Sequence, residues 1–94
     1  MTLTVKGYIK VPLEELETIK LYLDEHVQNT RSEVGCIEFN VEQSTEDKCI
    51  FNVFEVFVSR DAFDAHQDRV NASRWRSITK NVERFYQIEE LGPQ

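Results

Sequence analysis

Residues 49–58, CIFNVFEVFV, are the most informative stretch of the chain, because apolar side chains lie on both faces of the strand that they predict. Successive residues of a β-strand point to opposite faces. The apolar residues are Ile50, Phe54, Val56 and Val58 on one face and Cys49, Phe51, Val53 and Phe57 on the other. Both faces of such a strand need cover, and one layer of helices covers only one. We therefore expect a second subunit against the other face.

Three further stretches alternate between polar and apolar residues, which predicts strands at 3–11, 36–44 and 82–91. With residues 49–58 they make four strands. Helices are expected between the first and second strands and between the third and fourth. The order is therefore β-α-β-β-α-β, which is the split βαβ pattern. It predicts an α+β fold, a ferredoxin-like sandwich with an antiparallel sheet.

The helices are predicted from apolar spacing and from the residues that begin them. Pro12 ends the first strand and suits the first turn of a helix, where its missing N–H costs nothing. An apolar stripe at helical spacing then covers residues 13–27. Ser59 is the expected N-cap of a second helix over residues 60–68. A helical turn is expected around 74–81, before the last strand.

Length and charge narrow the function classes. The 94 residues are expected to form a single domain, 1–94. The net charge of −6, from 17 acidic and 11 basic residues, argues against binding to nucleic acid. No stretch approaches the ~20 apolar residues that span a bilayer, and the alternating N-terminus is unlike a secretory signal. We expect a cytoplasmic protein without a membrane partner.

Two cysteines bear on redox state and on metal binding. A hairpin around residues 45–48 pairs Cys36 with Phe57 and Cys49 with Ser44, so the two thiols lie far apart along the ladder. A disulfide needs Cα atoms within roughly 7 Å, so both cysteines are expected to be free, as in a reducing compartment. Neither belongs to a pair at zinc-ligand spacing, and no metal site is expected.

The sequence resembles the antibiotic biosynthesis monooxygenase family at three places. Residues 33–39, EVGCIEF, match an acidic residue and a Gly-Cys before the second strand. Residues 53–57, VFEVF, match a strand ending in Glu-x-aromatic, and residues 62–66, AFDAH, match a helix whose last turn bears a histidine. With the same order of elements, the resemblance covers nearly the whole chain.

This resemblance implies a homodimer, a dimeric α+β barrel in which two four-stranded sheets pack together and each subunit keeps a pocket between sheet and helices. Activities in the family include oxygenation of quinols and polyketide anthrones without metal or flavin, isomerisation of a small phosphosugar signal, and haem degradation. Because these activities share one fold, the fold alone does not settle the activity. The haem-degrading branch uses an asparagine on its first strand, whereas this chain has Lys6, Gly7 and Tyr8 there, which argues against haem degradation.

Three functions remain open. The first is a cofactor-independent monooxygenase that acts with O₂ on a small quinol-like or polycyclic aromatic molecule. The second is an isomerase or enolising enzyme of the same fold, and the third is a non-catalytic dimer that binds a metabolite. No cofactor is expected, because the chain contains neither a Gly-x-Gly-x-x-Gly loop nor a Gly-Lys-Ser/Thr loop.

His66 and Glu55 are the predicted catalytic residues. His66 shares a helix face with Phe63 and Val70, so it should point inward, where a neutral imidazole acts as a general base. The alternative is a structural histidine that bonds a core group. Glu55 is the lone ionisable residue of residues 49–58 and needs a partner or a raised pKa. It either orients His66 or binds a substrate hydroxyl, or else it forms an ion pair at a dimer interface.

The remaining candidates are expected to bind substrate. Four aromatic residues are expected to line a dry pocket: Phe51, Phe54, Phe57 and Trp75. Asn52 is expected to hydrogen-bond a ligand, Arg76 to stabilise an oxyanion, and Tyr86 to form part of the wall. His26 lies at the edge of the apolar stripe of the first helix, and we expect it to be partly exposed and not catalytic.

Overall fold

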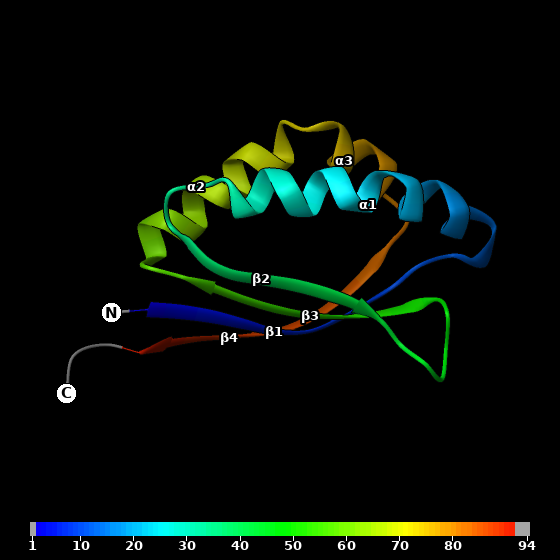
Figure 1. Cartoon of the computed structure of the whole chain (residues 1–94), viewed down its shortest axis with the longest axis horizontal. Coiled ribbons are helices and arrows are strands. Elements are labelled where there is room, and N and C mark those ends of the chain that lie inside the picture. The colour runs from blue at the N-terminus through cyan, green and yellow to red at the C-terminus, as the bar shows by residue number, and fades with distance from the viewer. Residues whose placement is uncertain (1, 92–94) are drawn as a thin grey trace.

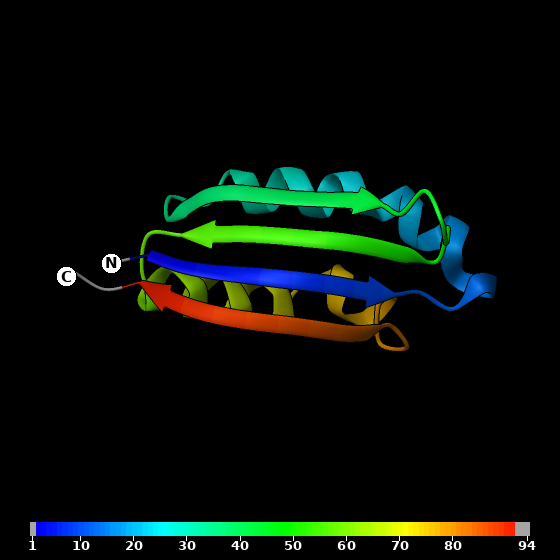
Figure 2. The same ribbon diagram turned by 90° about the horizontal axis from the view of Figure 1, so that it is seen from below.

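The computed structural model describes residues 2–91, which form one antiparallel sheet with helices on one of its faces (Figure 1). The strands are β1 (Thr2–Lys10), β2 (Cys36–Gln43), β3 (Ile50–Phe57) and β4 (Glu83–Leu91). Their order across the sheet is β2-β3-β1-β4, as Figure 2 shows from the side without helices. The predicted ferredoxin-like α+β fold is confirmed.

The helical layer contains a 3₁₀ turn, η1 (Leu13–Glu15), and the helices α1 (Leu16–Arg31), α2 (Arg60–Asn71) and α3 (Arg74–Ile78). Helix α1 lies behind the edge strand β2, and α2 lies behind β1 and β4 (Figure 2). The predicted N-cap at Ser59 is confirmed, since its side chain accepts a hydrogen bond from the Ala62 amide. No helix between residues 2 and 91 is long and apolar enough to cross a membrane.

The register of the β2–β3 hairpin differs from the prediction. Cys36 pairs with Phe57 as expected, but Glu38 pairs with Val56, so one extra residue bulges from β2. Beyond the bulge the ladder is displaced by one residue, and Ser44 donates its amide hydrogen to the carbonyl of Ile50. The predicted pairing of Cys49 with Ser44 is therefore wrong. The two cysteines are free, as predicted.

Two apolar clusters fill the space between the sheet and the helices. The larger contains Ile9, Val11, Leu16, Ile19, Phe51, Val53, Trp75 and Val82, and the smaller contains Leu3, Val5, Phe57 and Phe63. Glu55 lies on β3 between Val53 of the larger cluster and Phe57 of the smaller, and it is 5% exposed. A buried carboxylate at this boundary marks the place where the core becomes polar.

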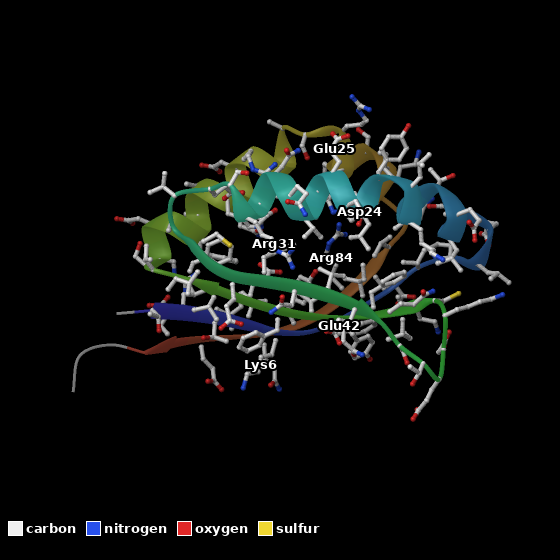
Figure 3. All side chains as sticks on the ribbon, viewed as in Figure 1. Lys6, Asp24, Glu25, Arg31, Glu42 and Arg84 are labelled. Carbon is white, nitrogen blue, oxygen red and sulfur yellow. The ribbon has the colours of Figure 1, made fainter. Side chains whose placement is uncertain are left out.

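The other face of the sheet is uncovered in the single chain. Alternation along β1 and β3 places Lys6, Tyr8 and Phe54 there, and Lys6 points away from the helices in Figure 3. Tyr8 stacks on Phe85 of β4 with ring centroids 4.7 Å apart, although the two residues remain 39% and 43% exposed. The Lys6 ammonium lies 6.0 Å from the Phe54 ring centroid. An aromatic face of this kind is typical of an interaction surface.

Candidate functional site

A cavity of about 150 Å³ lies between the helix-facing side of the sheet and the helices. Every strand and each of α1, α2 and α3 contributes to its lining, so the cavity exists only in the folded chain. The polar side chains that line it come from all parts of the sequence: His26, Glu55, His66, Gln67, Asn71, Arg76, Arg84 and Tyr86. The apolar remainder includes aromatic and aliphatic residues of both layers.

His66 is held by a carboxylate from outside its own helix. The residue is 4% exposed, and its Nδ1 lies 3.0 Å from Oε2 of Glu33, which follows α1. The same oxygen accepts a hydrogen bond of 2.7 Å from Nε of Arg69. That oxygen is an acceptor of the Arg69 guanidinium hydrogen, and it therefore accepts the Nδ1–H of His66 as well. This assignment of the proton leaves Nε2 of His66 as a hydrogen-bond acceptor.

The pKa of His66 is lowered by burial, which outweighs the opposing effect of the hydrogen bond to Glu33. A neutral imidazole with a free Nε2 lone pair is the form that takes a proton from a substrate. The ring also packs against Phe57, with centroids 4.9 Å apart, and against Phe39 at 5.9 Å. These contacts fix the direction of Nε2.

Glu55 faces His66 across a gap. Its Oε1 lies 3.9 Å from Nε2 of His66, which exceeds hydrogen-bond length. A hydroxyl or water oxygen between two polar groups at such a separation can bond to both. Burial, assisted by the negative charge of Glu33, raises the pKa of Glu55 to about 7. Near neutral pH the carboxyl group therefore both accepts and donates a proton.

His26 occupies a different environment from the one we expected. It is buried, 9% exposed, and its ring stacks on Trp75 with centroids 4.5 Å apart and planes 8° apart. Burial lowers the pKa of His26 to about 3. The prediction of partial exposure is wrong. The spacing contained the signal, because His26 follows Leu23 by three residues and Ile19 by seven, which places it on the buried stripe.

Glu33 is a second residue that the sequence did not single out as functional. It stands in the motif 33–39, but a side chain between helix and strand has no face that periodicity assigns. Only the packing of α2 beside the end of α1 brings Glu33 to His66 and Arg69. Arg69 extends the network through a hydrogen bond of 3.0 Å from its Nη2 to Oγ1 of Thr30, a fully buried residue.

Arginine and tyrosine residues stand at the β4 side of the cavity. Figure 3 shows the Arg84 side chain between sheet and helices, and its Nη2 donates a 2.7 Å hydrogen bond to Oγ1 of Thr79. Tyr86 is 40% exposed, but the partial burial of its phenol, assisted by the Glu55 charge, raises its pKa to about 12. Tyr86 is thus a neutral phenol that is available as a hydrogen-bond donor. Arg76 also lines the cavity, and its Nη1 donates a 3.1 Å hydrogen bond to Oδ1 of Asn71.

The predicted site residues fall into three groups by placement. His66, Glu55, Trp75, Arg76 and Tyr86 line the cavity.

Asn52 and Phe54 lie on the opposite face of β3, so neither reaches the ligand position predicted for it. Asn52 is three residues from Glu55, and an odd separation along a strand means opposite faces. Phe51 and Phe57 are buried on the helix side, but they belong to the packed core beside the cavity and not to its lining.

The polar groups are an imidazole pair, a carboxyl, a phenol, two carboxamides and two guanidinium groups, a set suited to proton transfer and to binding of an oxygen-bearing ligand. Within residues 2–91, no three or more His, Cys, Asp or Glu side chains are grouped to hold a metal ion.

Glu55→Gln is expected to remove a loss of stability that develops as pH rises from 4.5 to about 7. The folded-state pKa of about 7 exceeds the ordinary 4.5, so the folded state binds this proton more tightly than the unfolded state. The stabilising contribution of this bound proton is fully present below pH 4.5 and is lost as pH rises through 7. The variant should gain at most about 3 kcal/mol relative to wild type over this window. Urea unfolding at several pH values measures the difference.

Glu17→Gln, an exposed change on helix α1, is the matched control and should keep the pH dependence of the wild type. Parallel stability curves for wild type and Glu55→Gln would show that the carboxyl group is not held protonated by the fold.

The comparisons with known proteins agree with this architecture. The family model for antibiotic biosynthesis monooxygenases matches residues 2–78. A candidate antibiotic biosynthesis monooxygenase from Nitrosomonas europaea superposes with a TM-score of 0.82 at 22% identity, covering 96% of this chain and 97% of that one. A second candidate, from Deinococcus radiodurans, gives 0.81 at 20% identity, with 100% and 95% covered.

A conserved protein of unknown function from Bacteroides thetaiotaomicron gives a TM-score of 0.82 at 16% identity, with 96% of this chain and 97% of that chain covered. No curated protein matches the chain by sequence. Identities this low establish the shared fold, whereas the family model covers most of the sequence itself. The chain belongs to the antibiotic biosynthesis monooxygenase family.

Proposed function

We propose that the protein is a cofactor-independent monooxygenase that oxidises a small quinol-like aromatic molecule with O₂. The observation that carries the proposal is the arrangement of His66: Glu33 holds its Nδ1, and its Nε2 faces Glu55 across 3.9 Å at the wall of a cavity. A phenolic hydroxyl beside that gap can donate its proton to Nε2 of His66 and accept a hydrogen bond from the protonated carboxyl group of Glu55. Membership of the family supports the same class of reaction.

The proposed chemistry begins with loss of the phenolic proton to Nε2 of His66. The phenolate transfers one electron to O₂, and the resulting radical and superoxide combine to form a carbon–oxygen bond. The imidazolium returns its proton to the peroxide. Loss of the ring hydrogen then breaks the O–O bond and releases water. One oxygen atom stays on the ring and the other becomes water, so hydroquinone and O₂ would yield hydroxyquinone and water.

The cavity size favours a substrate with one ring. An apolar cavity of about 150 Å³ binds benzene in an engineered protein, and the cavity here has a similar volume of about 150 Å³. A single-ring quinol therefore fits better than a polycyclic anthrone. Trp75 and Phe39 supply aromatic surface beside the reacting groups.

We also propose that a second copy of the chain covers the uncovered sheet face, as the resemblance implies. Tyr8 and Phe85 stack there, and Phe54 occupies the central strand β3. Light scattering should give twice the mass of one chain. Phe54→Glu should lower that mass to a monomer, because the carboxylate would be buried against the partner.

Leu21→Glu is the matched control for this change. Leu21 is an exposed apolar residue of α1, 73% exposed on the helical layer, and its replacement should leave the mass unchanged. A monomeric wild type at micromolar concentration would refute the dimer, and a monomeric Leu21→Glu would place the contact on the helices.

The same pair of groups also suits an enolising isomerase, because His66 and Glu55 could take a proton from one carbon and return it to another. Oxygen consumption separates the two reactions. The purified protein, treated with a chelator, should consume O₂ with hydroquinone faster than hydroquinone autoxidises. With isotopically labelled O₂, one labelled atom should appear in the product.

Conversion that proceeds equally under anaerobic conditions would support the isomerase and exclude the oxygenase. Binding of quinols without either reaction would indicate a metabolite-binding protein.

A further inference from the structure

His26 is a buried polar residue whose role the packing does not explain. The ring lies flat on Trp75 and meets Phe39 edge-on, with centroids 5.6 Å apart and planes at 76°. Its Nδ1 is sealed from solvent, and no hydrogen-bond partner for this atom exists within residues 2–91. Buried polar atoms are nearly always hydrogen-bonded, so an exception needs an explanation. A phenylalanine would fill the same stack without that cost.

The environment indicates where the single proton of the neutral ring resides. Burial and the nearby cationic groups keep His26 neutral, with a pKa of about 3. A sealed, unpaired N–H is costlier than a sealed, unpaired acceptor, as the rarity of orphaned buried N–H groups indicates. The proton therefore belongs on Nε2, which is not among the sealed atoms. His26 then offers one neutral donor.

The donor and the base line the same cavity. The His26 and His66 ring centroids are 6.4 Å apart. A ring nitrogen lies slightly more than 1 Å from its centroid, and a hydrogen bond adds about 2.8 Å. When both nitrogens are turned toward it, one ligand oxygen reaches a nitrogen of each ring at once, with a centroid–oxygen–centroid angle of roughly 110° for these distances. That angle suits a hydroxyl group that donates one hydrogen bond and accepts another.

We propose that His26 donates its Nε2–H to the ligand oxygen whose proton His66 accepts, and so acts as a neutral stabiliser of the phenolate. This inference rests on the proposed function, because it assigns a hydroxyl of an aromatic ring to the gap beside His66. The phenol O–H bond breaks, the proton moves to Nε2 of His66, and the electron pair stays on oxygen, where it accepts the hydrogen bond from His26. No electron is transferred in this step.

The stack on Trp75 explains why this donor would be effective. A donor that is already aimed at the developing charge does not need to reorganise during the reaction. The T-shaped contact with Phe39 limits rotation of the imidazole, and the flat contact with Trp75 limits its tilt. A neutral ring also keeps its proton through the catalytic cycle, whereas a charged one could lose it to the phenolate.

The probe for this inference is 4-nitrophenol, whose phenolate absorbs visible light and can be titrated while bound. The wild type should lower the pKa of bound 4-nitrophenol below that in water. His26→Phe should raise the bound pKa by about one unit relative to wild type and weaken phenolate binding about tenfold, since a hydrogen bond to a charged group is lost. Nitrobenzene, which lacks the hydroxyl, should bind both proteins equally.

Two further measurements exclude a merely structural role. His26→Phe should melt no lower than wild type, because it keeps the aromatic stack and removes the unpaired nitrogen. His26→Gln, which restores an N–H donor, should recover part of the lost phenolate affinity. Nitrogen NMR of the free protein should find the neutral Nε2–H form of His26, and the Nδ1–H form would overturn the assignment.

The outcomes separate this inference from the proposed function. If 4-nitrophenol binds and titrates alike in wild type and His26→Phe, His26 is not the donor, while the oxygenase proposal stands on its O₂ uptake. If the wild type binds neither 4-nitrophenol nor hydroquinone, the aromatic-hydroxyl site fails and the role of His26 fails with it.

Discussion

His66→Gln is expected to lower the turnover number for O₂ uptake by roughly 10²–10⁴, the range for loss of a general base. The glutamine amide can still donate to Glu33, so the buried hydrogen bond at that end is kept. What is lost is the Nε2 lone pair, which faces Glu55 and the cavity. Initial rates with hydroquinone, corrected for autoxidation, measure the effect. Asp64→Asn on the exposed side of α2 is the matched control and should keep the wild-type rate.

The pH profile distinguishes a base from a residue that only packs. Activity should rise with pH through the pKa of His66, which burial places below its ordinary value of 6.5. Glu33 raises that pKa through its hydrogen bond and charge. Glu33→Gln should therefore move the acid limb of the profile to lower pH, besides lowering turnover. An unchanged acid limb in this variant, or a near-normal rate in His66→Gln, would remove His66 from the role of base.

Gly7→Ala is expected to destabilise the fold by more than about 3 kcal/mol, the scale of the severe single substitutions. An added Cβ would lie 1.9 Å from the carbonyl oxygen of Phe85 and 3.0 Å from Cα of Tyr86, both backbone atoms of the adjacent strand β4. Gly7 also has φ of +157°, a conformation that residues with a side chain rarely adopt. The strands must separate to accept the methyl group.

Thermal unfolding should show a fall in Tm of more than about 12 °C for a domain of this size. Lys10→Ala, at an exposed position near the end of β1, is the control and should change stability by less than about 0.5 kcal/mol. Gly7 pairs with Tyr86, so the substitution would also displace one wall of the cavity. A variant that melts with the wild type would show that β1 and β4 are less tightly joined than the geometry indicates.

The fold and the burial of His66 and Glu55 could be predicted because each depends on short-range periodicity. His66 follows Phe63 by three residues on a predicted helix, and Glu55 interrupts an apolar strand. These separations fix the side of an element on which a residue lies. The same rule placed Asn52 and Phe54 opposite Glu55, but it could not say which side of β3 faces the cavity. That choice depends on where the helices pack.

The bulge in β2 and the position of His26 mark two further limits of sequence reasoning. A bulge adds one residue to a strand, and nothing in the alternation of residues 36–44 requires it. His26 lay on the correct stripe, but whether the edge of a stripe is buried depends on the neighbouring helix. Here α3 brings Trp75 over the imidazole and seals it.

The periodicity of apolar residues along the sequence was enough to predict four strands, the helices between them and the inward direction of His66. This is because side-chain direction repeats every two residues in a strand and every 3.6 residues in a helix. The packing of separate elements decided the rest. It brought Glu33 and Arg69 to His66, raised the pKa of Glu55 by burial, and enclosed the cavity from residues of every strand. Contacts between residues more than 30 positions apart depend on the whole fold, and no periodicity along the chain encodes them.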